Sequence, residues 1–111
     1  MAITTEELAG GITQVILEGR LDIENSPAVD TRMKAIAGDR NSVLVDLRKV
    51  SFLGSMGLRA LVAPALAIQG RGGKLVLFGP NEMVTKVLKV SGIETMIPIH
   101  HEFQSALAAL R

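Results

Sequence analysis

Apolar and polar residues follow strand-like patterns in the first half of the chain. The segment Gly11–Gly19 is rich in β-branched residues and bounded by glycines, which predicts a strand. A Gly-Gly turn precedes it and makes Ile3–Leu8 its expected hairpin partner. Extended chain is expected to continue over Arg20–Ile23. The uninterrupted apolar run Ser42–Leu47 is typical of a strand that is covered on both faces.

Two further strands are expected in the second half. Lys74–Phe78 is another apolar run, which follows a turn at Arg71–Gly73. Met96–Ile99 is predicted as a short final strand, and Pro98 suits an edge better than the centre of a sheet. We interpret the apolar stretch that ends at Leu53 as a short loop between a buried strand and a helix.

Four segments carry apolar residues at helical spacing. The first is expected to be capped by Asn25 or Ser26, with Pro27 in its first turn, and to end at Gly38. The others are predicted over about Ser55–Gln69, from Pro80 or Asn81 to Gly92, and over His101–Leu110. The positions expected to face inward are Ala28, Val29, Met33, Ile36 and Ala37 in the first helix, Val84, Val87, Leu88 and Val90 or Ser91 in the third, and Phe103, Ala106, Leu107 and Leu110 in the fourth.

Pro64 stands inside the second of these helices. Its ring nitrogen cannot donate to the carbonyl of Ala60, and an interior proline typically costs about 3 kcal/mol and kinks a helix. We therefore expect this helix to be interrupted there.

The order of the elements, β-β-α-β-α-β-α-β-α, predicts a fold class. Repeats of strand, helix and strand favour a parallel sheet with right-handed crossovers. We expect residues 1–111 to form a single α/β domain with a mostly parallel central sheet of about five strands and about four helices. The first strand is the one expected to run antiparallel.

Composition excludes several classes of function. The 111 residues suit one domain, and a net charge of +1 with no clustered basic patch argues against direct nucleic-acid binding. Three Phe are the only aromatic residues, so base stacking is nearly unavailable. No window approaches the roughly 18 consecutive apolar residues of a membrane span, and no basic leader precedes the first strand, so we expect no membrane insertion and a cytoplasmic protein. The absence of cysteine agrees with a reducing compartment.

No catalytic, cofactor or metal motif is found. The segment Gly70–Lys74 faintly resembles a phosphate loop, but it precedes a strand and opens no helix. His100, His101 and Glu102 do not fit the zinc motif His-Glu-x-x-His, because Ser105 stands where the second histidine would be. No serine, histidine and acid can be assembled into a triad. We therefore expect no enzyme, no metal and no cofactor.

The stretch Asp46–Arg59 is the most informative part of the chain, because it places a serine after a strand and a loop, at the start of a helix. A hydroxyl at this position can cap the helix through its oxygen. It can also carry a phosphate, which the positive end of the helix dipole stabilises. Both interpretations of Ser55 are open from the local sequence.

Neighbouring residues have similar pairs of interpretations. Asp22 and Asn25 lie where a loop at the same end of an adjacent strand reaches the face of Ser55, or they serve helix capping and turn formation. Met56 is a contact for a partner or a filler of the core. Arg59 is a partner contact or a solvated charge.

From Gly11 to Leu110 the chain resembles the STAS domain, the fold of bacterial anti-sigma factor antagonists. No single motif is specific, but their order and spacing over most of the chain are. The matching segments are Gly19-Arg20-Leu21-Asp22, Val45-Asp46-Leu47, Val50-Ser51-Phe52, Ser55-x-Gly57-Leu58, Gly72-Gly73-x-Leu75 and Val87-Leu88-x-x-Ser91-Gly92.

The resemblance implies a partner and a switch. In such antagonists a serine at this helix start is phosphorylated by an anti-sigma factor that is also a serine kinase, and a serine phosphatase restores it. The unphosphorylated form binds the anti-sigma factor and frees the sigma factor. Ser55 is then the expected phosphoacceptor. The expected partner-binding residues are Asp22, Asn25, Phe52, Gly54, Met56 and Arg59.

The chain departs from the family pattern Asp-Ser-Ser/Thr-Gly at two positions. Gly54 replaces the acid, and Met56 occupies the usual acceptor position, so that Ser55 falls one place earlier. The alternative function is therefore a STAS regulatory or structural subunit of a transporter or signalling assembly that carries no phosphate. A small-ligand sensor is a third, weaker possibility. We expect a monomer or weak dimer, in which an exposed apolar patch of Phe52, Leu53 and Met56 would mediate pairing.

Overall fold

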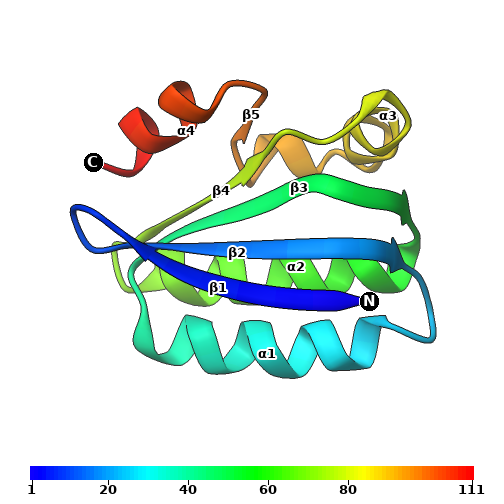
Figure 1. Cartoon of the computed structure of the whole chain (residues 1–111), viewed down its shortest axis with the longest axis horizontal. Helices are drawn as coiled ribbons and strands as arrows, with labels where there is room; N and C mark the ends of the chain where they lie inside the picture. Colours follow the sequence, from blue (N-terminus) through cyan, green and yellow to red (C-terminus); the bar gives the residue numbers. More distant parts are fainter.

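A five-stranded sheet in the order β1-β2-β3-β4-β5 forms the centre of the computed structural model, which describes all residues from 1 to 111 (Figure 1). The first strand is antiparallel to the second, and the remaining neighbours are parallel, as expected. The strands are β1 (Ala2–Leu8), β2 (Ile12–Leu21), β3 (Ser42–Leu53), β4 (Lys74–Phe78) and β5 (Ile99–His100).

Helices cover both faces of this sheet. The helices α1 (Ser26–Asp39) and α2 (Ser55–Gly70) pack against each other on one face, below the sheet in Figure 1, and α4 (Phe103–Leu110) covers the other. Side chains from α3 (Glu82–Ser91) join the larger core under α1 and α2. This core contains 21 buried residues against 7 under α4, so the first face holds most of the apolar stabilisation. None of the helices is long and apolar enough to cross a membrane.

The first part of β3, from Val43 to Leu47, and most of β4 are buried on both faces, which confirms the prediction from their apolar runs. Val43 and Val45 point into the core under α1 and α2, whereas Leu44 points into the core under α4. Leu75 and Leu77 of β4 alternate with its other apolar residues in the same way. Period-two alternation with no polar face is what a doubly covered strand requires.

The strand β3 is longer than predicted, and the expected apolar loop before α2 does not exist. The strand runs on to Leu53, because two extra residues are accommodated against β2. Ile16 pairs with Asp46 but Glu18 pairs with Lys49, which places one bulge between them; a second irregularity follows Gly19. Each bulge bends and twists the strand. The apolar pattern is broken at the bulges, so periodicity alone ends the strand too early.

Three other boundaries differ from the prediction. β2 ends at Leu21 and a turn follows, so Arg20–Ile23 is not extended throughout. The final strand is Ile99–His100 and not Met96–Ile99, because the chain still turns over Met96 and Ile97 after the 3₁₀ helix Ile93–Thr95. The helix α2 continues through Pro64, whose ring is buried, so packing holds the helix in spite of the missing hydrogen bond.

Helix starts and faces agree in part with the sequence reading. Asn81 caps α3 by accepting a hydrogen bond from the backbone N–H of Val84 at 2.8 Å, as predicted. Ala28, Val90 and Ser91, which were expected to face inward, are exposed. Val84 and Leu88 are buried as predicted, and Val87 is partly buried against the core, because the helix packs along only one narrow stripe.

A buried carboxylate holds the middle of the sheet on the α4 side. Asp46 is 1% exposed, and its Oδ2 accepts hydrogen bonds from Gln14 Nε2 at 3.0 Å and from an Arg48 guanidinium nitrogen at 2.8 Å. Burial raises the pKa of Asp46, but the hydrogen bonds and charge of Arg48 lower it more, so the pKa lies below its ordinary value. The apolar run around Asp46 does not by itself predict this pairing.

We predict that Asp46→Asn destabilises the fold at neutral pH by about 1–3 kcal/mol, because it removes the charge on which Arg48 and Gln14 converge. Since the pKa of the folded state is lowered, the ionised Asp46 stabilises the protein above pH about 4, and this stability is lost as the pH falls below that value. Urea unfolding between pH 7 and pH 2 measures both effects. The control Asp39→Asn changes a highly exposed carboxylate and should match the parent chain. An equally steep loss of stability in acid for Asp46→Asn and the parent would contradict the assignment.

Candidate functional site

The start of α2 is tied to the end of β2 by one backbone hydrogen bond. The N–H of Gly54 donates to the carbonyl oxygen of Leu21 at 3.1 Å, and the carbonyl of Gly54 accepts the first helical bond from Leu58 at 3.0 Å. Gly54 itself is extended (φ −101°, ψ 178°) and occupies the N-cap position. The helix therefore begins where β2 ends, at the carboxyl edge of the sheet.

Gly57 makes this close approach possible. A Cβ at this position would lie 2.7 Å from both Cγ and the carbonyl oxygen of Leu21, and 2.9 Å from a methyl carbon of Leu53. The Leu21 oxygen is already held by Gly54, so it cannot easily move aside. Only glycine lets the first turn of α2 lie this close to β2.

Ser55 is the first residue of α2 and is exposed to solvent. No side chain caps this helix, so the interpretation of Ser55 as an N-cap is wrong: Gly54 occupies that position. The first turn also lacks an acidic residue. Backbone N–H groups at an uncapped helix start favour an anion, and no carboxylate of the helix supplies one here.

The loop between β2 and α1 is organised by Asp22. Its Oδ1 accepts from the backbone N–H groups of Asn25 at 3.0 Å and Glu24 at 3.2 Å. The Asn25 bond is the main cause that holds the pKa of Asp22 below its ordinary value. Burial opposes it, and Glu24 and Arg20 lower the pKa further. Asp22 therefore presents a negative charge at this edge of the sheet at neutral pH.

Asn25 and Ser26 serve the turn rather than cap α1 with their side chains. Asn25 occupies the N-cap position as expected, but its side-chain amide donates to the carbonyl of Arg20 at 2.8 Å. The Ser26 hydroxyl donates to the carbonyl of Asp22. The interactions of Asn25 are thus those of turn formation.

Arg20 and Phe52 form a stacked pair beside the helix start. The second bulge of β3 pairs Arg20 with Phe52, and the guanidinium carbon lies 4.3 Å from the ring centroid. Arg20 also lies 3.5 Å from Asp22, Nε to Oδ2. A Cβ at Gly54 would lie 3.3 Å from the edge of the Phe52 ring. The stacked ring thus occupies space that a side chain at position 54 would need.

Two hollows surround the exposed start of α2. The first, which we call the loop hollow, has a volume of 380 Å³ and is lined by residues of the β2–α1 loop and the helix start, including Asp22, Phe52, Gly54, Ser55 and Met56. The second, the α1 hollow, has a volume of 320 Å³; Met56 and Arg59 line it together with the first residues of α1. The structure thus brings six of the seven predicted site residues together around Met56, and Asn25 lies in the adjoining loop.

Sequence reasoning missed two residues and misplaced one. Arg20 and Ile23 line the loop hollow, and Ile23 is 74% exposed. The spacing of Arg20 and Asp22, two residues apart at a strand end, was a usable signal because such side chains share one face. Leu53 is buried, so the expected apolar patch includes Phe52 and Met56 but not Leu53.

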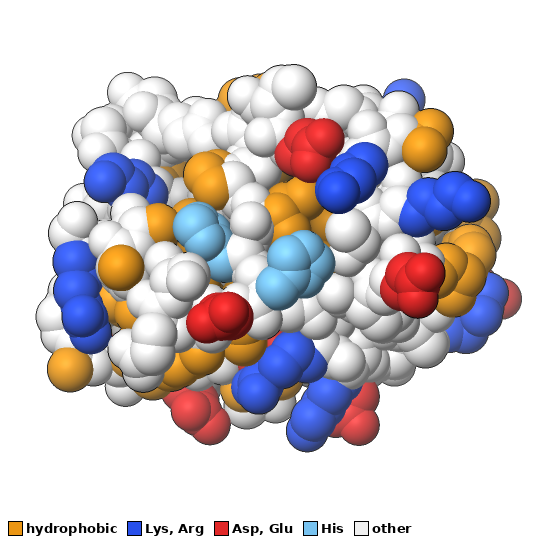
Figure 2. All heavy atoms as spheres, turned by 90° about the horizontal axis from the view of Figure 1, so that it is seen from above, with side chains coloured by type: hydrophobic (Ala, Val, Ile, Leu, Met, Phe, Trp, Pro, Cys, Tyr) orange, Lys and Arg blue, Asp and Glu red, His pale blue; other side chains and the backbone are white.

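Metal and nucleic-acid chemistry find no support in the arrangement of charges. No three His, Cys, Asp or Glu side chains lie close enough together to hold a metal ion. The face that carries α4 and β5 shows acidic and basic side chains interspersed, with no broad field of one sign (Figure 2).

Comparison with known proteins places this geometry in one family. The model of the STAS domain matches residues 4–106. The anti-sigma-B factor antagonist of Listeria monocytogenes is 27% identical over 86 residues, which cover 77% of this chain and 75% of that protein. Other relatives that the sequence comparison found are also named anti-sigma factor antagonists.

Solved structures agree with the fold. An anti-sigma factor antagonist from Mycobacterium paratuberculosis superposes with a TM-score of 0.88 at 27% identity, covering 99% of this chain and 95% of that one. The antagonist SpoIIAA of Bacillus, at 18% identity, matches with a TM-score of 0.82 in its unphosphorylated form and 0.75 in its phosphorylated form, over 99% of this chain and 96% and 100% of the respective chains. At 18% identity this last likeness speaks for the fold alone.

We predict that Gly57→Ala lowers the free energy of unfolding by about 1–3 kcal/mol, because the added methyl overlaps Leu21 and Leu53. The matched control is Gly38→Ala in α1, where a Cβ meets nothing within 4 Å, so stability should stay the same or rise by up to about 1 kcal/mol. Chemical denaturation compares the two variants. Equal stability of both would show that the contact between β2 and α2 is not tight.

Proposed function

The chain belongs to the STAS domain family, and we propose that it is a cytoplasmic anti-sigma factor antagonist that binds an anti-sigma factor with serine kinase activity. Phosphorylation of Ser55 by that kinase switches the binding off, and a serine phosphatase restores it. The observation that carries this proposal is the exposed, uncapped start of α2, with Ser55 as its first residue. The chain acts as a binding module and not as an enzyme.

The relatives support the first half of this proposal. The sequence relatives named above are anti-sigma factor antagonists. The same fold in this chain places a serine at the start of α2, in the hollow that the β2–α1 loop closes. The binding surface we propose consists of Asp22, Asn25, Phe52, Gly54, Met56 and Arg59.

The local electrostatics suit a reversible phosphate. A phosphoserine carries about −1.5 to −2 charges at pH 7. The positive end of a helix stabilises a nearby anion by about 0.3–1 kcal/mol, so the phosphate need not unfold the domain. Arg20 and Asp22 line the same hollow and their charges cancel, so the phosphate would make the hollow negative. A partner that fits the unphosphorylated surface is then repelled.

The side chains of this surface suit contact with a partner protein. Met56 is 40% exposed between the loop hollow and the α1 hollow, and its flexible thioether adapts to a partner side chain. Phe52 adds a ring whose outer neighbour is the Arg20 guanidinium. Aromatic, methionine and arginine side chains are enriched at protein interfaces relative to the rest of the surface.

We predict that the cognate anti-sigma factor kinase, chosen among those encoded in the source genome, transfers phosphate from ATP to Ser55 and to no other residue. Mass spectrometry of the product locates the phosphate, and Ser55→Ala should abolish it. Ser55→Asp should weaken binding of the same kinase by about tenfold or more, which corresponds to about 1.4 kcal/mol.

Ser105 offers the matched control, since it is an exposed serine in another helix's first turn. Ser105→Asp should bind the kinase as the parent chain does. Phosphate found elsewhere, or full binding by Ser55→Asp, would disprove the switch while leaving the binding surface to be tested by itself.

One observation favours a second candidate function, a STAS subunit of a transporter or signalling assembly that is never phosphorylated. Met56 occupies the family's usual acceptor position and cannot take a phosphate. In that case the surface around Met56 binds its partner permanently. Absence of phosphorylation together with tight binding through Met56 would favour this candidate over the switch.

We predict that Met56→Ala weakens partner binding by about tenfold, because it removes an apolar contact from the centre of the proposed surface. Met96→Ala is the matched control: Met96 is 44% exposed but lies between α3 and β5, outside both hollows. Calorimetric titration with the anti-sigma factor measures both variants. Equal losses for the two variants would remove Met56 from the interface.

A further inference from the structure

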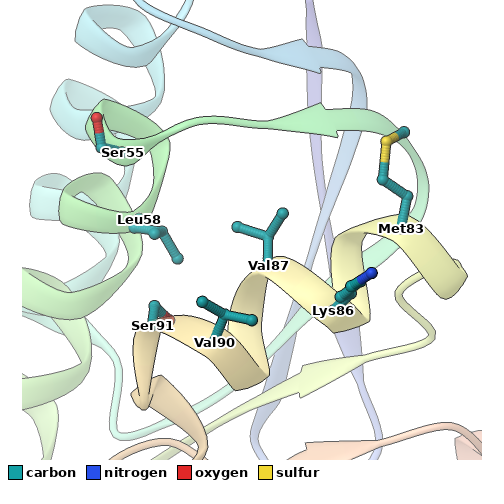
Figure 3. A pocket seen from close by; sticks show the side chains of 7 residues that line it. All are labelled: Ser55, Leu58, Met83, Lys86, Val87, Val90 and Ser91. Atoms are coloured by element: carbon teal, nitrogen blue, oxygen red, sulfur yellow. The ribbon is translucent and has the colours of Figure 1, made fainter.

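A third hollow lies on the other side of Ser55, between the start of α2 and the outer face of α3. We call it the α3 groove. It has a volume of 460 Å³ and is open to solvent along α3. In Figure 3 Leu58 of α2 and Val87 of α3 point into it, with Val90 and Ser91 along one side and Met83 and Lys86 toward the start of α3.

The helix α3 carries two apolar stripes, and only one of them is buried. Val84 and Leu88 pack into the core. Met83, Val87 and Val90 form the second stripe at helical spacing, and it borders the groove. Met83 is 54% exposed and Val90 is 82% exposed, although the sequence pattern predicted Val90 to face inward. Val87 between them is partly buried and packs against the core. An apolar stripe that stays half open to solvent is typical of a surface that a partner covers.

The charges of the groove point to the chemistry of that partner. Lys86 is the only charged residue that lines it, and two serines are its other polar residues. No acidic side chain lines the groove to pair with Lys86, and no salt bridge within the chain involves it. An apolar surface with one unpaired ammonium is complementary to a ligand with an apolar face and a carboxylate at its edge.

We propose that the α3 groove binds an amphipathic helix of the anti-sigma factor, with an acidic side chain of that helix paired to Lys86. The second stripe on α3 spans eight residues, about 10 Å of helix, and so offers sites for apolar residues spaced i, i+3 or i+4 and i+7 on a partner helix. The open shape suits an elongated helix better than a small molecule, which a pocket normally encloses on most sides. This inference rests on the proposed function, because it names a second contact of the same partner.

Ser55 connects the groove to the switch. It lines both the loop hollow and the α3 groove, so a partner seated on the helix start covers both. A phosphate on Ser55 would place about two negative charges at the edge of the groove, beside an acidic helix. Phosphorylation then weakens binding through the groove as well as through the loop hollow.

Charge reversal tests the pairing of Lys86. The anti-sigma factor kinase that binds the parent chain is titrated into Lys86→Glu and into Lys89→Glu, which makes the same change on α3 outside the groove. Binding should weaken by about tenfold or more for Lys86→Glu, since like charges now face each other, and by less than about twofold for Lys89→Glu. Replacing the facing acid of the partner helix by lysine should restore the binding of Lys86→Glu.

A second pair of variants tests the apolar stripe. Val90→Asp introduces a charge into the groove. Leu66→Asp introduces the same charge outside it, at an exposed leucine of α2 that lines none of the three hollows. Both side chains are largely exposed, so both variants should fold, which thermal unfolding checks. Only Val90→Asp should weaken binding, by about tenfold or more.

The outcomes separate this inference from the proposed function. If Met56→Ala weakens binding while Lys86→Glu and Val90→Asp bind as the parent does, the groove is not used and the proposed function stands. If none of the anti-sigma factors binds the parent chain, both proposals fall. A titration with dodecanoate tests the other occupant: saturation of the groove by this fatty acid, with partner binding unchanged in Lys86→Glu, would assign the groove to an acyl chain and overturn the helix.

Discussion

The carbonyl oxygen of Leu21 is the contact on which the site depends. It ends β2, accepts the N–H of Gly54, and lies against Gly57 where a side chain would have no room. One oxygen therefore fixes the position, the start and the closeness of α2 relative to the sheet. Without it the helix could begin a residue earlier or later, and the face that it presents at the carboxyl edge of the sheet would rotate by about 100° per residue.

The rest of the surface follows from this fixed start. Ser55 becomes the first helical residue, with its hydroxyl in solvent and the backbone N–H groups of the first turn free. The bulges of β3 bring Phe52 beside Arg20, and Asp22 holds the loop that closes the hollow from the other side. The same helix start separates this hollow from the α3 groove. Apolar surface and unpaired charge thus gather around one residue that a kinase can modify.

Much of the fold was predictable, because local rules and the tertiary structure agree over most elements. The buried runs of β3 and β4, the antiparallel first hairpin and the cap at Asn81 follow from periodicity, glycine turns and capping chemistry. The site was predictable less completely. The two bulges interrupt the period of β3, and the capping role of Ser55 failed because a helix start is set by the tertiary contact at Leu21. Val90 was assigned to the core because an apolar stripe looks the same whether a core or a partner covers it.

The most direct test of this account is a titration of the ¹⁵N-labelled chain with its unlabelled anti-sigma factor, followed amide by amide. The account places the partner over the start of α2, so the amides of Asp22, Ser55 and Met56 and those along α3 should shift or broaden, and phosphorylation at Ser55 should reverse these changes. Changes confined to α4 or to the outer edge of β1, with the start of α2 unaffected, would contradict it.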